Sequence, residues 1–200
     1  MLSCPERGET LRETLTSLQR CGWPLSRVLL DDQQGPPSME RFNRAWLRML
    51  GEAALASTDF VLLLEDDLIF GYWFAENLLS WPLLREPANG VFFGSLYNHG
   101  HARLSGGSER HWVADPHYSW GSQALVLTPR LARFLLANWS KMPGNADQRM
   151  PRLAAAVTPV CYHRPSLVQH ARGPSTWGAM AHEARDFELF WRAKEAGAAW

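Results

Sequence analysis

Residues 60–67, FVLLLEDD, decide the fold of this chain. Five consecutive apolar residues are typical of a strand that is covered on both faces in a parallel sheet. The run ends in three acids, Glu65, Asp66 and Asp67. Ligands of open α/β sheets bind beyond the carboxyl ends of the strands, so we expect these acids to border a functional site.

Helical and strand patterns alternate on both sides of this stretch. The predicted elements are a helix (10–22), a strand (27–30), a helix (39–53), the strand at 60–64, a helix (72–84), a strand (91–97), a long loop (98–119), a strand (124–127), a helix (129–139), a short helix (147–155), a strand (160–163) and a helix (181–196). Thr10 and Glu13 have the spacing of a capping box, and Ser38 is placed to cap the second helix. The alternation predicts a single α/β domain over residues 1–200, with an open, mostly parallel sheet and helices on both faces.

The composition excludes several classes of protein. The chain has 200 residues, 46% of them hydrophobic, which suits one domain with a full core. Lys plus Arg number 20 and Asp plus Glu number 20, so nucleic acids and anionic membranes are not expected partners. Three cysteines without CxxC spacing indicate neither a disulfide framework nor a zinc site. No apolar run is long enough to span a bilayer, and we expect a cytoplasmic protein.

Two of the predicted strands end in acid clusters, Asp31-Asp32 and residues 65–67. Two carboxylates 4 Å apart repel by about 4 kcal/mol at an effective dielectric constant near 20, so such a cluster needs a counter-ion. A divalent cation, Mg²⁺ or Mn²⁺, suits an oxygen-rich site whose remaining ligands are phosphates. The alternative is that the acids cap a helix or pair with arginines.

The sequence LLLEDD resembles the metal-binding DxD-type motif of GT-A-fold glycosyltransferases, in its EDD form. The resemblance implies that Asp67 binds the metal directly and that Asp66 supports it, while Glu65 either faces the ribose or is held structurally. Residues 6–18 resemble the start of the nucleotide-binding half of that fold. The nucleotide contacts implied by this likeness are Glu6, Arg7, and Asp31 or Asp32.

Two further segments extend the resemblance. Residues 120–136, WGSQALVLTPRLARFLL, are similar to the strand and helix that line the acceptor side, with Trp120 and Gly121 near the substrate. Asp147 then holds the place of the catalytic base of inverting members; the alternative is an acid of the first helical turn. Residues 165–176, PSLVQHARGPST, resemble the C-terminal segment of N-acetylglucosaminyltransferase-IV-like families. This likeness implies that His170 reaches the metal and that Trp177 lies beside a sugar; the alternative for His170 is a semi-buried structural histidine.

The resemblance implies a divalent-metal-dependent enzyme that moves a sugar from a nucleotide-diphosphate donor, such as a UDP-sugar, to a carbohydrate or other hydroxyl acceptor. Residues 1–97 would form the nucleotide and metal half, and residues 98–200 the acceptor half. The first strand is short, because four residues precede Pro5, and we expect no membrane anchor of the kind common in eukaryotic members. Two alternatives stay open: a metal-dependent phosphoester hydrolase, and a non-catalytic carbohydrate- or nucleotide-sugar-binding module. A receiver domain is excluded, because both lysines, Lys141 and Lys194, fall in or beside helical segments.

Overall fold

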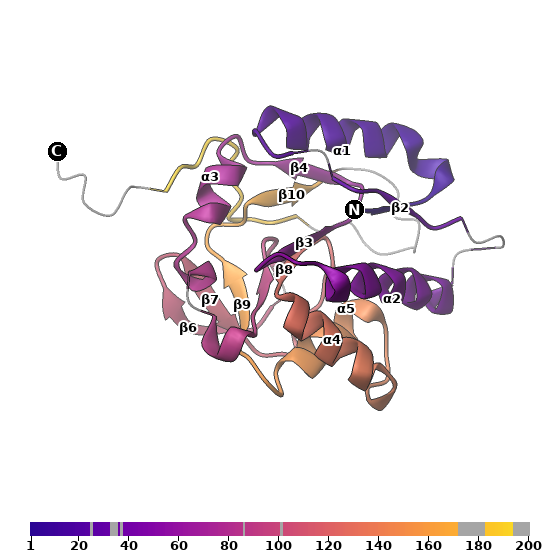
Figure 1. Ribbon diagram of the computed structural model, residues 1–200. Helices are drawn as coiled ribbons and strands as arrows, with labels where there is room; N and C mark the ends of the chain where they lie inside the picture. Colours follow the sequence, from indigo (N-terminus) through magenta and orange to yellow (C-terminus); the bar gives the residue numbers. More distant parts are fainter. Residues whose placement is uncertain are drawn as a thin grey trace.

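The chain forms three layers, with the main sheet between two sets of helices (Figure 1). The computed structural model describes residues 1–24, 26–32, 36, 38–85, 87–100, 102–171 and 183–193. Its helices are η1 (Pro5–Arg7), α1 (Gly8–Arg20), α2 (Met39–Leu55), α3 (Phe74–Leu79), η2 (Pro82–Leu84), η3 (Ala88–Gly90), α4 (Pro129–Asn138), η4 (Trp139–Lys141) and α5 (Ala146–Ala154). Its strands are β1 (Leu2–Ser3), β2 (Leu29–Leu30), β3 (Val61–Leu64), β4 (Leu68–Phe70), β5 (Phe93–Ser95), β6 (Leu104–Ser108), β7 (His111–Ala114), β8 (Ala124–Leu127), β9 (Val160–His163) and β10 (Val168–His170).

The main sheet is mixed, which corrects the expectation of a mostly parallel one. Its six strands follow the order β3-β8-β5-β9-β7-β6, and among the described strands only its β5–β9 pair runs parallel. Two smaller sheets pair β1 with β2 in parallel and β4 with β10 antiparallel. A continuous apolar run predicts burial on both faces, but burial does not set the direction of the neighbouring strand. The α/β class and the helices on both faces are confirmed.

Each face of the sheet has its own core. On one face α2, α4 and α5 pack against side chains such as Leu63 and Leu125. On the other face α1, α3 and the β4–β10 pair pack against Leu64 and Val126. Neighbouring residues of β3 and β8 therefore enter opposite cores, as the pleat of a strand requires.

Among the described α-helices, α2 and α4 begin at a capping side chain, Ser38 and Thr128 respectively. The Ser38 hydroxyl accepts a hydrogen bond from the Arg41 N–H at 3.1 Å, so the predicted cap of α2 is confirmed. The predicted capping box is wrong: α1 begins at Gly8, and Thr10 lies inside the helix. The turn η1 leads directly into α1, so the helix starts earlier than a cap at Thr10 would allow.

Two predictions for the second half of the chain are wrong. Residues 98–119, expected to be a loop, contain the hairpin β6–β7, which joins the main sheet through β9. Its strands are short and carry Gly106 and Gly107, so they lack the apolar alternation that identifies a strand. The described part of the expected C-terminal helix, residues 183–193, forms turns.

Candidate functional site

The three acids form the turn between β3 and β4, and helix α1 holds this turn in place. The Thr14 hydroxyl donates to the Asp66 carbonyl oxygen at 2.6 Å and accepts from the Leu68 N–H at 3.0 Å. Thr14 lies one helical turn from Leu18, and both side chains are buried. One buried hydroxyl therefore holds the backbone on both sides of Asp67.

Arg7, the last residue of η1, forms ion pairs with two of the acids. Its Nε lies 2.9 Å from Asp66 Oδ1, and its Nη2 lies 2.5 Å from Asp67 Oδ2. The Ser3 hydroxyl donates to the other carboxylate oxygen of Asp66. Burial raises the pKa of Asp66, although Ser3 and Arg7 both favour its charged form. The residues that end β1 and begin α1 thus enclose the acid turn.

His170, which is distant in the sequence, lies beside the carboxylate of Asp67. In the β4–β10 pair His170 lies opposite Leu68, and the Ala171 N–H donates to the Asp67 carbonyl oxygen at 2.7 Å. This pairing places His170 Nε2 3.2 Å from Asp67 Oδ2. Burial opposes the charged form of both side chains, but their mutual interaction outweighs it: the pKa of His170 is raised, although the charge of Arg7 opposes this, and the pKa of Asp67 is lowered, with the help of Arg7.

Glu65 connects the acid turn to the start of β8. Its N–H donates to the Gln123 carbonyl oxygen at 2.8 Å, and its carboxylate accepts a hydrogen bond from the Ser122 hydroxyl. Burial and the nearby charge of Asp67 raise the pKa of Glu65. The site therefore keeps one of its carboxyl groups in an environment that favours the protonated form.

Tyr97 and the segment 183–193 add to the same neighbourhood. The Gln169 side chain accepts from the Ala184 N–H at 2.9 Å and donates to the Ala184 carbonyl at 3.1 Å, which ties this segment to β10. Burial raises the pKa of Tyr97, and the charges of Glu183 and Asp67 raise it further. Glu183 is thus a further acid close to the cluster.

The residues expected on the acceptor side form a second group, adjacent to the first. Asp147 lies in the first turn of α5; burial raises the pKa of Asp147, while nearby backbone N–H groups, that of Gly121 among them, lower it. Gly121 has a φ of +98°, and a Cβ there would lie 2.6 Å from the Gln123 side-chain oxygen, so glycine is required. The Trp120 ring stacks on His99, with centroids 5.4 Å apart and planes 15° apart. Residues 121 and 122, consecutive in the chain, therefore link Asp147 to Glu65.

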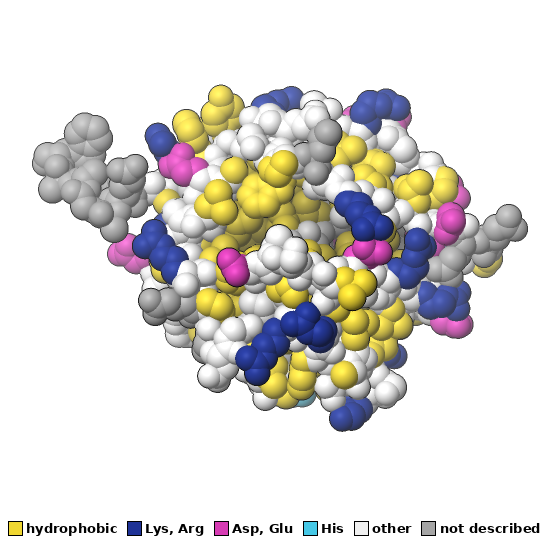
Figure 2. Space-filling view, in the orientation of Figure 1, with side chains coloured by type: hydrophobic (Ala, Val, Ile, Leu, Met, Phe, Trp, Pro, Cys, Tyr) yellow, Lys and Arg dark blue, Asp and Glu magenta, His cyan; other side chains and the backbone are white. Residues whose placement is uncertain are grey.

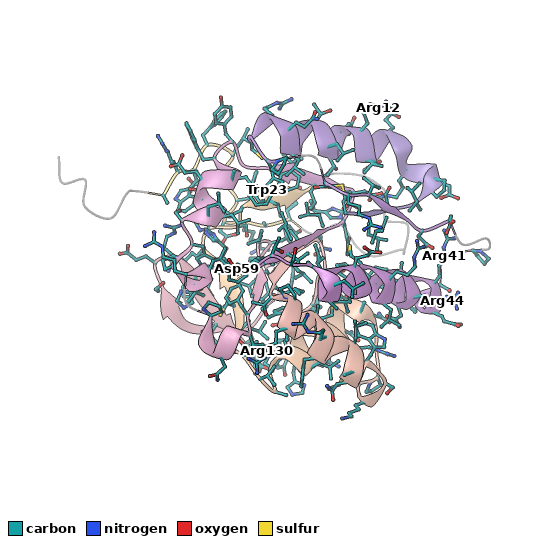
Figure 3. All side chains as sticks on the ribbon, in the orientation of Figure 1. Arg12, Trp23, Arg41, Arg44, Asp59 and Arg130 are labelled. Carbon is teal, nitrogen blue, oxygen red and sulfur yellow. The ribbon has the colours of Figure 1, made fainter. Side chains whose placement is uncertain are left out.

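Three expected nucleotide contacts lie apart from the acid turn. Asp31 is buried and forms an ion pair with Arg41 of α2, at 2.6 Å between Asp31 Oδ2 and Arg41 Nε (Figure 3). Asp32 and Glu6 are exposed. Asp31 and Asp66 nevertheless flank the same strand end, because the Asp31 N–H donates to the carbonyl oxygen of Ser3 at 2.7 Å. Trp177 lies outside the described residues.

The donor set of the acid turn fits a divalent cation that is completed by a ligand. Among the residues that the structure describes, no three His, Cys, Asp or Glu side chains converge as a ready-made metal cage. Asp67 Oδ1, however, is buried and makes no hydrogen bond to any described residue. The 3.2 Å separation of His170 Nε2 and Asp67 Oδ2 also matches two ligands at right angles around one ion, about 3 Å apart for bonds near 2.1 Å. Mg²⁺ is commonly held by one or two carboxylates plus phosphates, and Asp67 fits such a role.

Several contributors to the site carry no signal in the sequence. They are Ser3, Thr14, Tyr97, Ser122 and Glu183. Ser3 ends β1 and Ser122 lies just before β8, and a position at the end of a strand is the one property that could have selected them. Thr14 is at a core position of α1, where a hydroxyl is unusual and needs a hydrogen-bond partner.

The surface has no dominant charged region on the face that Figure 2 shows. Lys and Arg side chains stand at separate places between acidic ones, and apolar side chains gather in a hollow between the α1 and α2 layers (Figure 2). Within the described residues, no helix combines the length and the apolar character needed to cross a membrane. In comparisons with known proteins, no protein-family model and no curated protein matches this chain.

Proposed function

We propose that this protein is a glycosyltransferase that binds a nucleotide-diphosphate sugar together with Mn²⁺ or Mg²⁺ and transfers the sugar to a hydroxyl acceptor. The observation that carries this proposal is the contact of Asp67 with His170. The resemblance to GT-A-fold enzymes implies a shared metal for these two residues, and they lie far apart in the sequence. Their 3.2 Å approach is what such a role requires.

The chain's own residues would divide the work as follows. Asp67 and His170 would hold the ion, and Ser3 and Thr14 would keep the acid turn in place. A bound divalent ion would stabilise the negative charge that develops on the departing diphosphate. Glu65 would accept a hydrogen bond from the ribose, in line with its position beside the metal ligands.

Asp147 is the base that we propose for the acceptor hydroxyl. Its raised pKa brings it closer to neutral pH, which makes a carboxylate a more effective base. Its Oδ1 is buried and makes no hydrogen bond to any described residue, so this oxygen has the capacity to accept a proton. The Trp120 ring beside Gly121 would provide an apolar surface for a sugar.

Binding of UDP in the presence and absence of Mn²⁺, measured by thermal shift and calorimetry, tests the proposal. We expect Mn²⁺-dependent binding by the wild-type protein and its loss in Asp67→Asn, because an amide is a weaker ligand than a carboxylate. Asp66→Asn should be milder, since Asp66 supports the site without binding the ion. Asp59→Asn is the matched control, as Asp59 is exposed and lies before β3 (Figure 3).

Two results would contradict the proposal. The first is that UDP and UDP-sugars fail to bind with or without Mn²⁺. The second is that Asp67→Asn binds UDP with an unchanged dependence on Mn²⁺. Hydrolysis of a simple phosphoester such as p-nitrophenyl phosphate without any nucleotide binding would favour the hydrolase instead.

A further inference from the structure

We propose that Arg7 is an exchangeable counter-ion, which occupies the cation position of the acid turn in the ligand-free protein and moves to the diphosphate when a divalent ion binds. This inference rests on the proposed function for the identity of the ion and the diphosphate. The inference goes beyond the proposed function because it assigns the coupling between metal binding and nucleotide binding to one side chain, that of Arg7.

The geometry of Arg7 is that of a competitor for the metal. Its Nη2 lies 2.5 Å from Asp67 Oδ2, the same oxygen that His170 Nε2 approaches at 3.2 Å. Its Nε lies 2.9 Å from Asp66 Oδ1, so the guanidinium spans both aspartates. A divalent ion bound to Asp67 Oδ2 would stand close to this guanidinium, and the repulsion between the two cations would be strong in a half-buried site. Arg7 and the ion therefore exclude each other at Asp67 Oδ2.

The position of Arg7 also lets it leave without unfolding the site. Its side chain is 17% exposed, so part of it already meets solvent. The acid turn has other supports, because Thr14 holds its backbone and Ser3 holds Asp66. Movement of Arg7 away from the acid turn thus breaks its ion pairs with Asp66 and Asp67 and leaves these hydrogen bonds in place.

The displaced guanidinium has an obvious new partner. Arginine binds phosphate oxygens through two parallel N–H groups, and a diphosphate bound to the metal brings such oxygens next to the acid turn. Binding of the ion to Asp67 would thus release Arg7 to bind the diphosphate. The diphosphate, in turn, would stabilise the state in which the ion is bound to Asp67. Metal and nucleotide then bind with positive coupling, and by linkage each raises the affinity of the other equally.

The experiment measures Mn²⁺ affinity without nucleotide, from the electron paramagnetic resonance signal of free Mn²⁺. We expect Arg7→Gln to bind Mn²⁺ about tenfold more tightly than wild type, or tighter still, because the competitor is gone. In saturating Mn²⁺ the same variant should bind UDP about tenfold or more weakly, since a charge-assisted phosphate contact is lost. Arg12→Gln is the matched control. Arg12 is exposed in the second turn of α1, and its substitution should change neither the Mn²⁺ affinity nor the UDP affinity (Figure 3).

Arg7→Lys keeps the protein testable if Arg7→Gln does not fold. A lysine keeps the positive charge but cannot pair with both aspartates at once, so Mn²⁺ affinity should rise less and UDP affinity should still fall. Unchanged or weaker Mn²⁺ binding by the folded variant, beside Mn²⁺-dependent UDP binding by wild type, overturns the exchange and leaves the proposed function intact. Absence of Mn²⁺ binding in wild type and variant alike overturns the exchange, and if Mn²⁺ also fails to bind in the presence of UDP, the proposed function is overturned with it.

Discussion

Replacing His163 with asparagine should remove a pH dependence of folding stability that this one histidine creates. His163 is 1% exposed at the end of β9, with ring centroids 4.9 Å from Trp81 and 5.8 Å from Trp191. Its Nδ1 lies 2.6 Å from the carbonyl oxygen of Pro165, so Nδ1 carries the proton. Burial, assisted by the positive charges of Arg110 and His111, lowers the pKa of His163 to about 3.

The magnitude follows from the difference between the folded and unfolded states. The unfolded chain binds a proton at His163 below a pKa of about 6.5, and the folded protein does so only near 3. Between these values the unfolded state holds more protons, so stability rises with pH and is lost as pH falls below about 6.5. At pH 5 the unfolded state gains about 2 kcal/mol from this group relative to pH 8.

Urea unfolding at pH 8 and at pH 5, followed by circular dichroism, measures this difference. The asparagine of His163→Asn keeps an N–H near Pro165 but cannot titrate, and its smaller side chain should cost about 1–3 kcal/mol at pH 8. At pH 5 the gap between wild type and variant should shrink by about 2 kcal/mol. His117→Gln, at an exposed histidine, is the control and should leave the gap to wild type unchanged. Equal gaps for His163→Asn at both pH values would refute the reasoning.

Two further predictions test the second residue group and the packing of the sheet. Asp147→Asn should lower turnover by roughly 10²- to 10⁴-fold with UDP-sugar affinity nearly unchanged, because a base acts only in the transition state; unaltered turnover would assign Asp147 to the helix start alone. Gly94→Ala should destabilise the protein by about 1–3 kcal/mol in urea unfolding, since its Cβ would lie 2.8 Å from the Trp81 ring and from Phe92 Cε1. A loss below about 0.5 kcal/mol would mean that these rings move aside freely.

The elements with strong local patterns could be predicted from the sequence, and those that depend on partners could not. Helices α2 and α4 carry apolar residues at helical spacing behind a Ser or Thr cap, and β3 and β8 are continuous apolar runs. In contrast, β4 and β10 are three residues each and exist because they pair with each other. Strand direction was mispredicted for the same reason, because it depends on which strands become neighbours and not on the composition of either.

The candidate site shows the same division between local and distant information. Glu65, Asp66 and Asp67 stand out because acids at the end of a buried strand are costly without a partner. His170 was selected by resemblance alone, since a single histidine in a short polar strand has no distinctive pattern. Thr14 could not be found at all: a threonine at a core position of a helix becomes significant only when the Asp66 carbonyl lies beside it.

The sequence treats the two acid clusters as equivalent, and the structure separates them by their counter-ions. Asp31 is matched by the guanidinium of Arg41, at 2.6 Å in a buried pair, and the exposed Asp32 carboxylate lies 3.7 Å from the guanidinium of Arg48. The turn after β3 holds three acids, with Glu183 nearby, against the single fixed charge of Arg7. The fold limits this excess by raising the pKa of Glu65 and of His170, so that both favour their protonated forms. The acid turn thus balances its charge partly with groups that can give up a proton, whereas Asp31 has a permanent partner in Arg41, and this difference makes the second cluster the candidate for binding a further cation.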